Sequence, residues 1–444
     1  MHELEKFLGE LSNWVWGPWT LAILCGTHLF LTFRLRFIQR YIGKAIKISF
    51  ERSKEGEGDV SQFGALTTAL AATIGAGNIV GVATAVASGG PGAIFWLWIT
   101  GVFGISTKYA EALLSSKYRV KTKDGTMAGG PMYVLEKGMN CKWLGVLFAV
   151  FTAITAIGIG NMVQANSAAV LVYETFHIPH WITGLVIMVL TGAVILGGIK
   201  SISRACETLV PFMAIFNILG CLILFVLKFD TLPQAIVLIF QSAFTGQAAI
   251  GGFLGATMKE AVRYGVARGL FSNESGMGSG AIVAAAAQTK NPVRQALVSS
   301  TGTFWDTVVM CALTGLVYVN SGAWTLGLNG AGLAKAAFDD IPVIGPIVLS
   351  VSLFTFVIAT ILGWSYYGEK ACEYLFGSKA IKPYRYLWVG AVMAGSVLSL
   401  PIVWSLADIT NACMAIPNLI SLLVLSGVVV EETRKHLWTK EAQP

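Results

Sequence analysis

Polar, glycine-rich sequence interrupts two long apolar stretches of this chain: Ile74-Gly75-Ala76-Gly77-Asn78 in the first half and Phe271-Ser272-Asn273-Glu274-Ser275-Gly276-Met277-Gly278 in the second. Within the hydrocarbon of a membrane, irregular backbone survives only where it is buried in protein or lines a polar cavity. The two breaks are separated by close to half of the 444 residues. Paired breaks at corresponding places in two halves of a chain are the best sequence indication of the binding site of a secondary transporter.

The composition is that of an integral membrane protein. Hydrophobic residues make up 55% of the chain and charged residues only 12%, about half of the roughly 25% that is usual for soluble domains. The chain has no low-complexity linker, so we expect a single membrane domain over residues 1–444. The net charge of +7 follows the membrane topology, and we expect no nucleic-acid partner.

Eleven apolar segments are long enough to cross about 30 Å of hydrocarbon. They lie at about residues 14–33, 64–87, 92–116, 143–172, 181–199, 206–227, 256–288, 295–318, 343–369, 384–403 and 408–430. Basic residues gather in alternate connections, including Lys200 and Arg204, and the positive-inside rule places those connections in the cytoplasm. We therefore predict a plasma-membrane protein with its N-terminus outside and its C-terminus in the cytoplasm.

Removing the first segment leaves ten, which divide into two groups of five. Because five is odd, the second group crosses the membrane in the opposite sense, as in an inverted repeat. The predicted parts are an extra N-terminal helix at 14–33, a first repeat at 64–229, a second repeat at 231–430 and a cytoplasmic tail at 431–444. We expect residues 231–255 to form a re-entrant or interfacial hairpin on the outer face. The half-span that follows carries Arg263 and Arg268 and is expected to face an outer vestibule or other protein.

The chemistry of the two breaks suits a small zwitterion. The N-terminal end of a half-helix carries about half a positive charge and free amides, whereas the C-terminal end carries free carbonyls. We expect the first break to bind a carboxylate through its amides and the second to accept an ammonium through its carbonyls. Close helix packing is the alternative explanation for the glycines. The predicted substrate-binding residues of the breaks are Gly75, Ala76, Gly77, Asn78, Phe271, Ser272, Asn273 and Gly276.

Polar residues within the spans add further candidates. Glu274, in the second break, and Asp306, in mid-span, are acidic residues predicted to neutralise a cation or relay a proton. Lys108 and Glu111 are three residues apart, and an i,i+3 ion pair is the expected explanation for them. Gln164 is interpreted either as a substrate contact or as a hydrogen-bonding group between helices.

Three longer motifs resemble those of a known family: Gly89-Gly90-Pro91-Gly92-Ala93-Ile94-Phe95-Trp96-Leu97-Trp98, Gly160-Asn161-Met162-Val163-Gln164-Ala165-Asn166 and Gly269-Leu270-Phe271-Ser272-Asn273-Glu274-Ser275-Gly276-Met277-Gly278. They look like the alanine or glycine:cation symporters of bacteria and archaea, and the resemblance covers nearly the whole chain. It implies an all-α polytopic fold similar to the leucine-transporter type, with ten core helices in two inverted halves and the first helix of each half unwound. It also implies sodium-driven uptake of alanine or glycine across a prokaryotic plasma membrane, with sodium co-transported and no other cofactor.

Sodium is a hard cation, so by analogy with calcium and magnesium it should take oxygen ligands. The resembling fold implies one sodium between the first break and the third helix of the second half. By that alignment its ligands are the carbonyls of Ala71, Ile74 and Phe356 and the hydroxyl of Thr360. A second sodium site is predicted from Thr73, Asn78 and Ser272.

Thr360 and Trp364 are four residues apart and project from one helix face. We therefore predict that both contact the substrate, with Trp364 as a wall or lid that restricts the pocket to small side chains. An ordinary core aromatic is the alternative for Trp364.

Three other functions are weighed against sodium symport. Proton coupling is the main alternative, and the choice between alanine and glycine stays open. An ion channel is less favoured, because channels build filters by surrounding a pore with repeated elements. An enzyme is not expected, because the chain contains no H-E-x-x-H, G-x-S-x-G or G-x-x-x-x-G-K motif.

Overall fold

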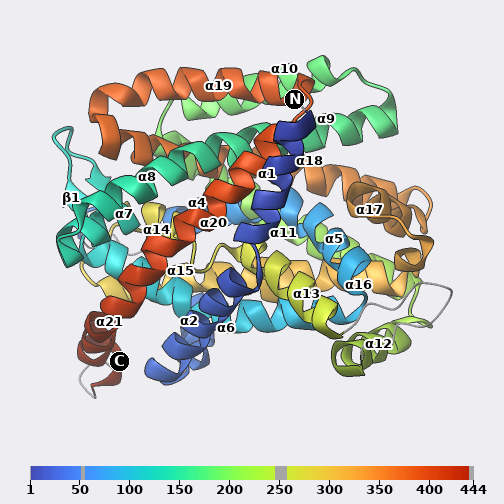
Figure 1. Cartoon of the computed structure of the whole chain (residues 1–444), viewed down its shortest axis with the longest axis horizontal. Helices are drawn as coiled ribbons and strands as arrows, with labels where there is room; N and C mark the ends of the chain where they lie inside the picture. The colour runs from blue at the N-terminus through green and yellow to red at the C-terminus, as the bar shows by residue number, and fades with distance from the viewer. Residues whose placement is uncertain (1, 52–55, 246–257, 440–444) are drawn as a thin grey trace.

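The structure of the protein is a computed structural model that describes residues 2–51, 56–245 and 258–439. These residues are almost entirely helical (Figure 1). One short antiparallel pair, β1 (Val120–Lys121) and β2 (Met127–Ala128), is the strand structure in this part of the chain. The apolar composition therefore forms helices, as expected for a chain whose backbone must satisfy its own hydrogen bonds in lipid.

The first break divides one apolar stretch into two helices that are bent by 60° relative to each other. They are α4 (Gln62–Thr73) and α5 (Val80–Gly89), joined through the 3₁₀ turn η2 (Ala76–Asn78). The hydroxyl of Ser61 begins α4 by accepting a hydrogen bond from the amide of Gly64. Such a side-chain cap satisfies one of the amides that a helix leaves free at its start.

The second break separates α13 (Met258–Asn273) from the short α14 (Ser279–Ala284). Between them the backbone takes positive φ values at Glu274 (54°), Gly276 (92°) and Gly278 (82°). Positive φ is readily available to glycine and uncommon for other residues. The glycines of this motif therefore allow the chain to leave one helix and start another within a few residues.

Unbroken helices surround these elements. The remaining helices are α1 (His2–Val15), α2 (Pro18–Arg34), α3 (Ile42–Ser49), α6 (Gly92–Lys117), α7 (Pro131–Tyr133), α8 (Lys142–Ile157), α9 (Val163–Phe176), α10 (His180–Ile195), α11 (Ile199–Leu227), α12 (Leu232–Thr245), α15 (Pro292–Thr303), α16 (Ala312–Asn320), α17 (Gly330–Asp339), α18 (Ile344–Phe376), α19 (Ile381–Val397), α20 (Pro401–Val424) and α21 (Ser426–Thr433). Two π-helical turns, η4 (Gly158–Met162) and η5 (Phe304–Cys311), join α8 to α9 and α15 to α16.

The broken helices lie in the interior of this arrangement. Helix α6 packs against α13, α14 and α15, and α4 packs against α11, α15 and α18. Helices α10 and α19 lie side by side at one edge, and α1 lies along α20 (Figure 1). Both breaks are thus enclosed by long helices, which can supply side chains to the interrupted backbone.

Five helices of the described residues are long and apolar enough to cross a membrane, or up to seven if each bent pair is one span. The predicted count of eleven spans and the inverted repeat stay predictions. The predicted boundary before the sixth segment is wrong: α11 begins at Ile199 and includes Lys200 and Arg204, which were expected in a loop. Long basic side chains can extend from a helix end to the membrane surface, so a charge does not have to end the helix. The helix predicted at 14–33 corresponds to α2, which begins at Pro18. The predicted hairpin begins with α12 and continues into residues 246–257, which lie outside the described residues.

The segment before α4 is tied to the segment after α14. Val60 forms a parallel backbone bridge with Ala287. The guanidinium of Arg119, just beyond α6, donates hydrogen bonds to the carbonyls of Ala287 (2.7 Å), Thr289 (2.8 Å) and Glu57 (2.9 Å). We call this set of contacts the Arg119 clasp. The clasp joins the segment just before α4 to the segment just after α14.

Arg119→Gln is expected to loosen this end of both broken helices. A hydrogen bond to a charged group contributes about 1.5–3 kcal/mol, and about 1.4 kcal/mol changes an equilibrium tenfold. In a cysteine-free background carrying Val60→Cys, we expect maleimide to label the new thiol at least about tenfold faster after this substitution. The matched control is Lys121→Gln, which removes an exposed ion pair to Glu57 of small expected energy. Equal labelling rates in the two variants would contradict the role of the clasp.

Candidate substrate and cation site

The first break redirects two backbone amides to side chains. The amide of Gly75 donates to Oδ1 of Asn78 (2.9 Å), and the amide of Ala76 donates to Oε1 of Gln164 (3.2 Å). In a continuing helix these amides would reach the carbonyls four residues earlier, at Ala71 and Ala72. The break therefore releases the last carbonyls of α4 from helical hydrogen bonding, as predicted for a ligand site.

The first break also borders a small cavity of about 90 Å³, which we call the central cavity. Ala76, Gly77, Gln164 and Phe271 are among its lining residues. A Cβ atom at Gly77 would meet only the ring of Phe271, at 3.7 Å. The amide of Gly77 makes no cap or turn hydrogen bond with the rest of the described chain. Packing does not require glycine at position 77, and the space beside it belongs to the cavity.

Gly75 has a different role, because it permits close approach of α18. A Cβ atom at Gly75 would lie 2.5 Å from Oγ1 of Thr360. That hydroxyl oxygen is 3.3 Å from the carbonyl oxygen of Ile74 and 2.9 Å from that of Phe356. Ala71 is fully buried and lies one turn before Ile74 on α4. The structure thus brings together oxygen atoms of three of the four residues predicted as ligands of the first sodium.

A buried carboxylate connects the two breaks. Asp306, in η5, is fully buried and accepts hydrogen bonds from Nδ2 of Asn78 (2.7 Å), Oγ of Ser272 (2.9 Å) and Oγ1 of Thr307 (2.7 Å). Asn78 and Ser272, two of the three residues predicted for the second sodium site, therefore meet at Asp306. The hydroxyl of Thr73, the third residue, bonds instead to a carbonyl of its own helix. All the hydrogen bonds that Asp306 receives here come from neutral side chains.

A second carboxylate holds the second break. Oε1 of Glu111, in α6, accepts hydrogen bonds from the amides of Gly276 (2.8 Å) and Gly278 (3.1 Å) and from the side chain of Asn418 (2.7 Å). The predicted ion pair with Lys108 is wrong, since Nζ of Lys108 is buried without a hydrogen-bond partner among the described residues. Backbone amides that lose their helical partners in a membrane interior require other acceptors. Glu111 is the acceptor for two such amides of the second break.

The remaining polar groups of the second break bond mainly within it. The hydroxyl of Ser279 donates to the carboxylate of Glu274, and Oδ1 of Asn273 accepts the amide of Ser275 (2.9 Å). Glu274 is buried. Asn273 and Gly276, predicted as substrate contacts, therefore form hydrogen bonds that hold the conformation of the loop.

Trp364 is buried one turn beyond Thr360 on α18. Trp364 packs against the backbone of Gly160: a Cβ atom added to Gly160 would lie 2.4 Å from the Cβ of Trp364. The rings of Trp364 and Tyr367 make an edge-on contact, with 5.4 Å between their centroids. It is not among the residues that line the central cavity. Its role as a pocket wall stays a prediction.

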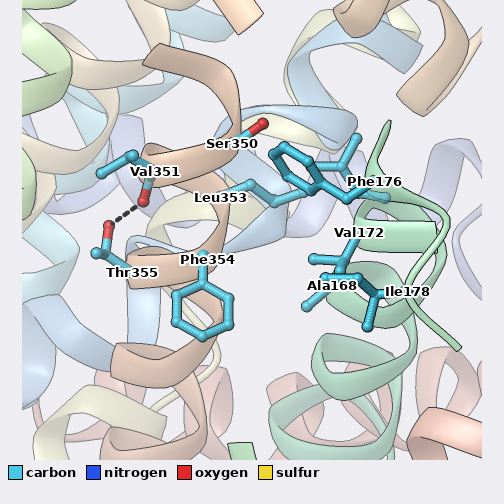
Figure 2. Close-up of a pocket in the computed structure, with 10 residues that line it drawn as sticks. Ala168, Val172, Phe176, Ile178, Ser350, Val351, Leu353, Phe354 and Thr355 are labelled. Carbon is cyan, nitrogen blue, oxygen red and sulfur yellow. Dashed lines mark hydrogen bonds between the residues drawn. The ribbon is translucent and has the colours of Figure 1, made fainter. Parts of the chain in front are cut away.

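A larger cavity, of about 360 Å³, lies between α9 and α18, away from the breaks. Figure 2 shows Phe176, Leu353 and Phe354 around it. Its lining is almost wholly apolar and contains none of the predicted site residues. Such a lining offers no partner for the charges of a zwitterion, so the central cavity is the better candidate.

Comparison with known sequences gives a family over the full length. The model of the sodium:alanine symporter family matches residues 1–444. The chain is 51% identical over 443 residues to the sodium/alanine symporter AgcS of Methanococcus maripaludis, with 97% of each chain covered. It is 35% identical over 442 residues to the putative sodium/proton-dependent alanine carrier protein YrbD of Bacillus subtilis, covering 95% of this chain and 90% of that protein.

Comparison with solved structures tests the fold. The structure of MhsT in complex with L-phenylalanine matches with a TM-score of 0.59 and 16% sequence identity, covering 86% of this chain and 94% of that chain. The likeness confirms an all-helical fold similar to transporters of the leucine-transporter type. The full-length match and the similarity to AgcS show that this chain belongs to the sodium:alanine symporter family.

Proposed function

We propose that this protein couples the entry of sodium to the uptake of alanine and glycine by alternating access across a prokaryotic plasma membrane. Family membership makes it a multi-pass membrane transporter rather than an enzyme. The names of its relatives, a sodium/alanine symporter and a putative sodium/proton-dependent alanine carrier, support sodium and alanine as the transported pair. Eleven spans, with the N-terminus outside and the C-terminus inside, form part of this proposal.

The position of Asp306 is the observation on which the proposal mainly rests. A buried carboxylate whose hydrogen-bond partners are all neutral has no compensating charge in direct contact, and burying a charge in that way is costly. Sodium bound beside Asp306 and the hydroxyl oxygen of Ser272 would supply that charge. Asn78 donates to Asp306 through Nδ2, so its Oδ1 would become a ligand only on releasing the amide of Gly75. Because Asn78 and Ser272 come from different breaks, cation binding there would favour one arrangement of the two broken helices.

The other proposed sodium, predicted as the first site, lies where α18 meets the end of α4. Its ligands are the carbonyls of Ala71, Ile74 and Phe356 and the hydroxyl of Thr360. The contacts of Thr360 with Ile74 and Phe356 support this choice, as does the release of the Ala71 carbonyl by the break. Oxygen ligands suit a hard cation.

The proposed substrate site lies between the breaks, in the central cavity. The amide of Gly77 would bind the carboxylate at the start of the half-helix. The amides of Ala76 and Asn78 would join it on releasing their present acceptors, Oε1 of Gln164 and the carbonyl of Gly75. The carbonyls that end α13, at Phe271, Ser272 and Asn273, would accept the ammonium. The small cavity, which Gln164 lines, favours alanine and glycine over larger side chains. Thr360 and Trp364, outside its present lining, are proposed to contact the bound substrate.

Alanine accumulation is expected to require an inward sodium gradient and to be electrogenic. For each net positive charge that moves with the zwitterion, a potential of about 100 mV supplies about 2.3 kcal/mol, which corresponds to roughly fifty-fold accumulation. The measurement is uptake of labelled alanine by proteoliposomes with sodium on the outside only, in parallel with choline at the same pH. Equal uptake in choline would refute sodium coupling, and uptake driven there by a proton gradient would favour the proton as the coupling ion.

Gly77→Val is expected to abolish alanine binding to protein that remains folded. The added side chain would occupy the space in which the substrate carboxylate meets the backbone amides, whereas neighbouring protein leaves room for it. Calorimetry on purified protein measures the loss. The control is Gly302→Val in α15, where a Cβ atom meets only Leu66 and Leu70, at 3.8 and 3.9 Å. If Gly77→Val binds alanine with wild-type affinity, the substrate does not approach this part of the break.

A further inference from the structure

Helix α2 has an apolar stripe along its exposed side. The large residues of this stripe recur every three or four positions, or at twice that spacing, and all are exposed: Trp19, Ile23, Phe30 and Phe33. Leu24, between them in sequence, is fully buried, and α2 packs against α6. Exposed apolar surface of this extent marks a site of contact with lipid or protein. In a multi-pass membrane protein, the stripe of α2 is available to the acyl chains of lipids.

The chain bends sharply where this stripe ends. Arg36 and Phe37 both have positive φ, 53° and 57°, which is uncommon for residues other than glycine. The turn η1 (Ile38–Tyr41) follows, and the helical span from there to Ser49 is bent by 66° relative to the span that ends at Arg34. Strained backbone persists only where surrounding contacts hold it, and it is frequent at binding sites.

Contacts beyond the bend hold α3 in place. Ile48 is buried, and α3 packs against α15. The ring of Phe50 contacts that of Phe63 in α4, with 5.7 Å between the centroids. The guanidinium of Arg294, in α15, pairs with the carboxylate of Glu51 (2.8 Å). The bend is therefore fixed at both ends, by α2 on one side and by α4 and α15 on the other.

Three exposed arginines lie at this bend, and we call them the arginine bend: Arg34, Arg36 and Arg40. None of them forms an ion pair within 4.0 Å with any residue that the structure describes. Each guanidinium lies over an aromatic ring instead, at 4.8 to 5.6 Å from the ring centroid. The ring beneath Arg36 is that of Trp438, in the C-terminal turn η8 (Arg434–Trp438). A guanidinium that stacks through its face keeps the N–H groups at its edge for other partners.

We propose that the arginine bend binds the headgroup of an anionic phospholipid whose acyl chains lie along the apolar stripe of α2. Guanidinium groups bind phosphate through two parallel hydrogen bonds. Lys44 and Lys47 of α3 add positive charge to the segment after the bend, and such clusters attract anionic lipids. A phospholipid fits better than a free phosphate, because the basic residues begin where the apolar stripe ends. The inference requires a membrane protein but does not depend on which ion or amino acid is transported.

Native mass spectrometry of the delipidated full-length protein tests this inference. The protein is titrated with phosphatidylglycerol or with phosphatidylcholine that has the same acyl chains. The wild type is expected to bind phosphatidylglycerol at least about tenfold more tightly, because only that lipid carries a net negative charge. The triple variant Arg34→Gln/Arg36→Gln/Arg40→Gln should lose this preference. The charge-matched control has three exposed lysines replaced elsewhere and should keep it: Lys123→Gln/Lys379→Gln/Lys382→Gln.

A single substitution keeps the test valid if the triple arginine variant does not fold. Phe37→Asp places a carboxylate at the bend, in a residue type that accepts positive φ more readily than phenylalanine, and should also lose the preference. Equal affinity of the wild type for the two lipids would refute headgroup binding. An equal loss in the lysine control would show that net charge alone attracts the lipid. A dimer that binds no phosphatidylglycerol would assign the stripe to a second copy of the chain and overturn the inference.

Discussion

The buried carboxylate of Asp306 is the interaction on which the arrangement of both breaks depends. It receives hydrogen bonds from Asn78 in the first break and Ser272 in the second, so one side chain fixes their distance from each other. Each hydrogen bond to a charged group contributes about 1.5–3 kcal/mol, yet a buried negative charge still calls for a positive partner. This way of holding the interrupted helices is the reason why we propose a cation site at Asp306.

The loss of helical hydrogen bonds at the breaks also explains other contacts in the interior. Interrupting a helix within a membrane leaves amides and carbonyls without partners, and unbroken neighbours supply the replacements. Glu111 of α6 accepts the amides of Gly276 and Gly278, and Gln164 accepts the amide of Ala76. The amide of Gly77 and the end carbonyls of α4 are not used in this way, and these are the groups that we propose to face substrate and sodium.

The sequence predicted the features that depend on residues close together in the chain. Glycine and polar residues within apolar runs predicted both breaks, and the family resemblance placed Thr360 beside the end of α4. Contacts between distant helices were not predictable in this way. Asn78 and Ser272 were predicted to share a sodium site, but Asp306 was a separate candidate, and no periodicity indicates that it meets them. Glu111 was paired with Lys108 because the two residues are three apart in the sequence. Its hydrogen-bond partners Gly276 and Gly278 lie far away in the sequence, so no local pattern indicates them. The Arg119 clasp depends on backbone carbonyls, which leave no mark in side-chain patterns.

The central claim is that Asp306 contributes to a cation site that links the breaks. Its most direct test is the alanine affinity of Asp306→Asn as a function of sodium concentration, since ligands that favour the same state raise each other's affinity. With two sodium sites, the logarithmic slope of alanine affinity against sodium is expected to approach about two in the wild type and about one in the variant. An unchanged slope in folded Asp306→Asn protein would show that sodium binds elsewhere and that this carboxylate has only a structural role.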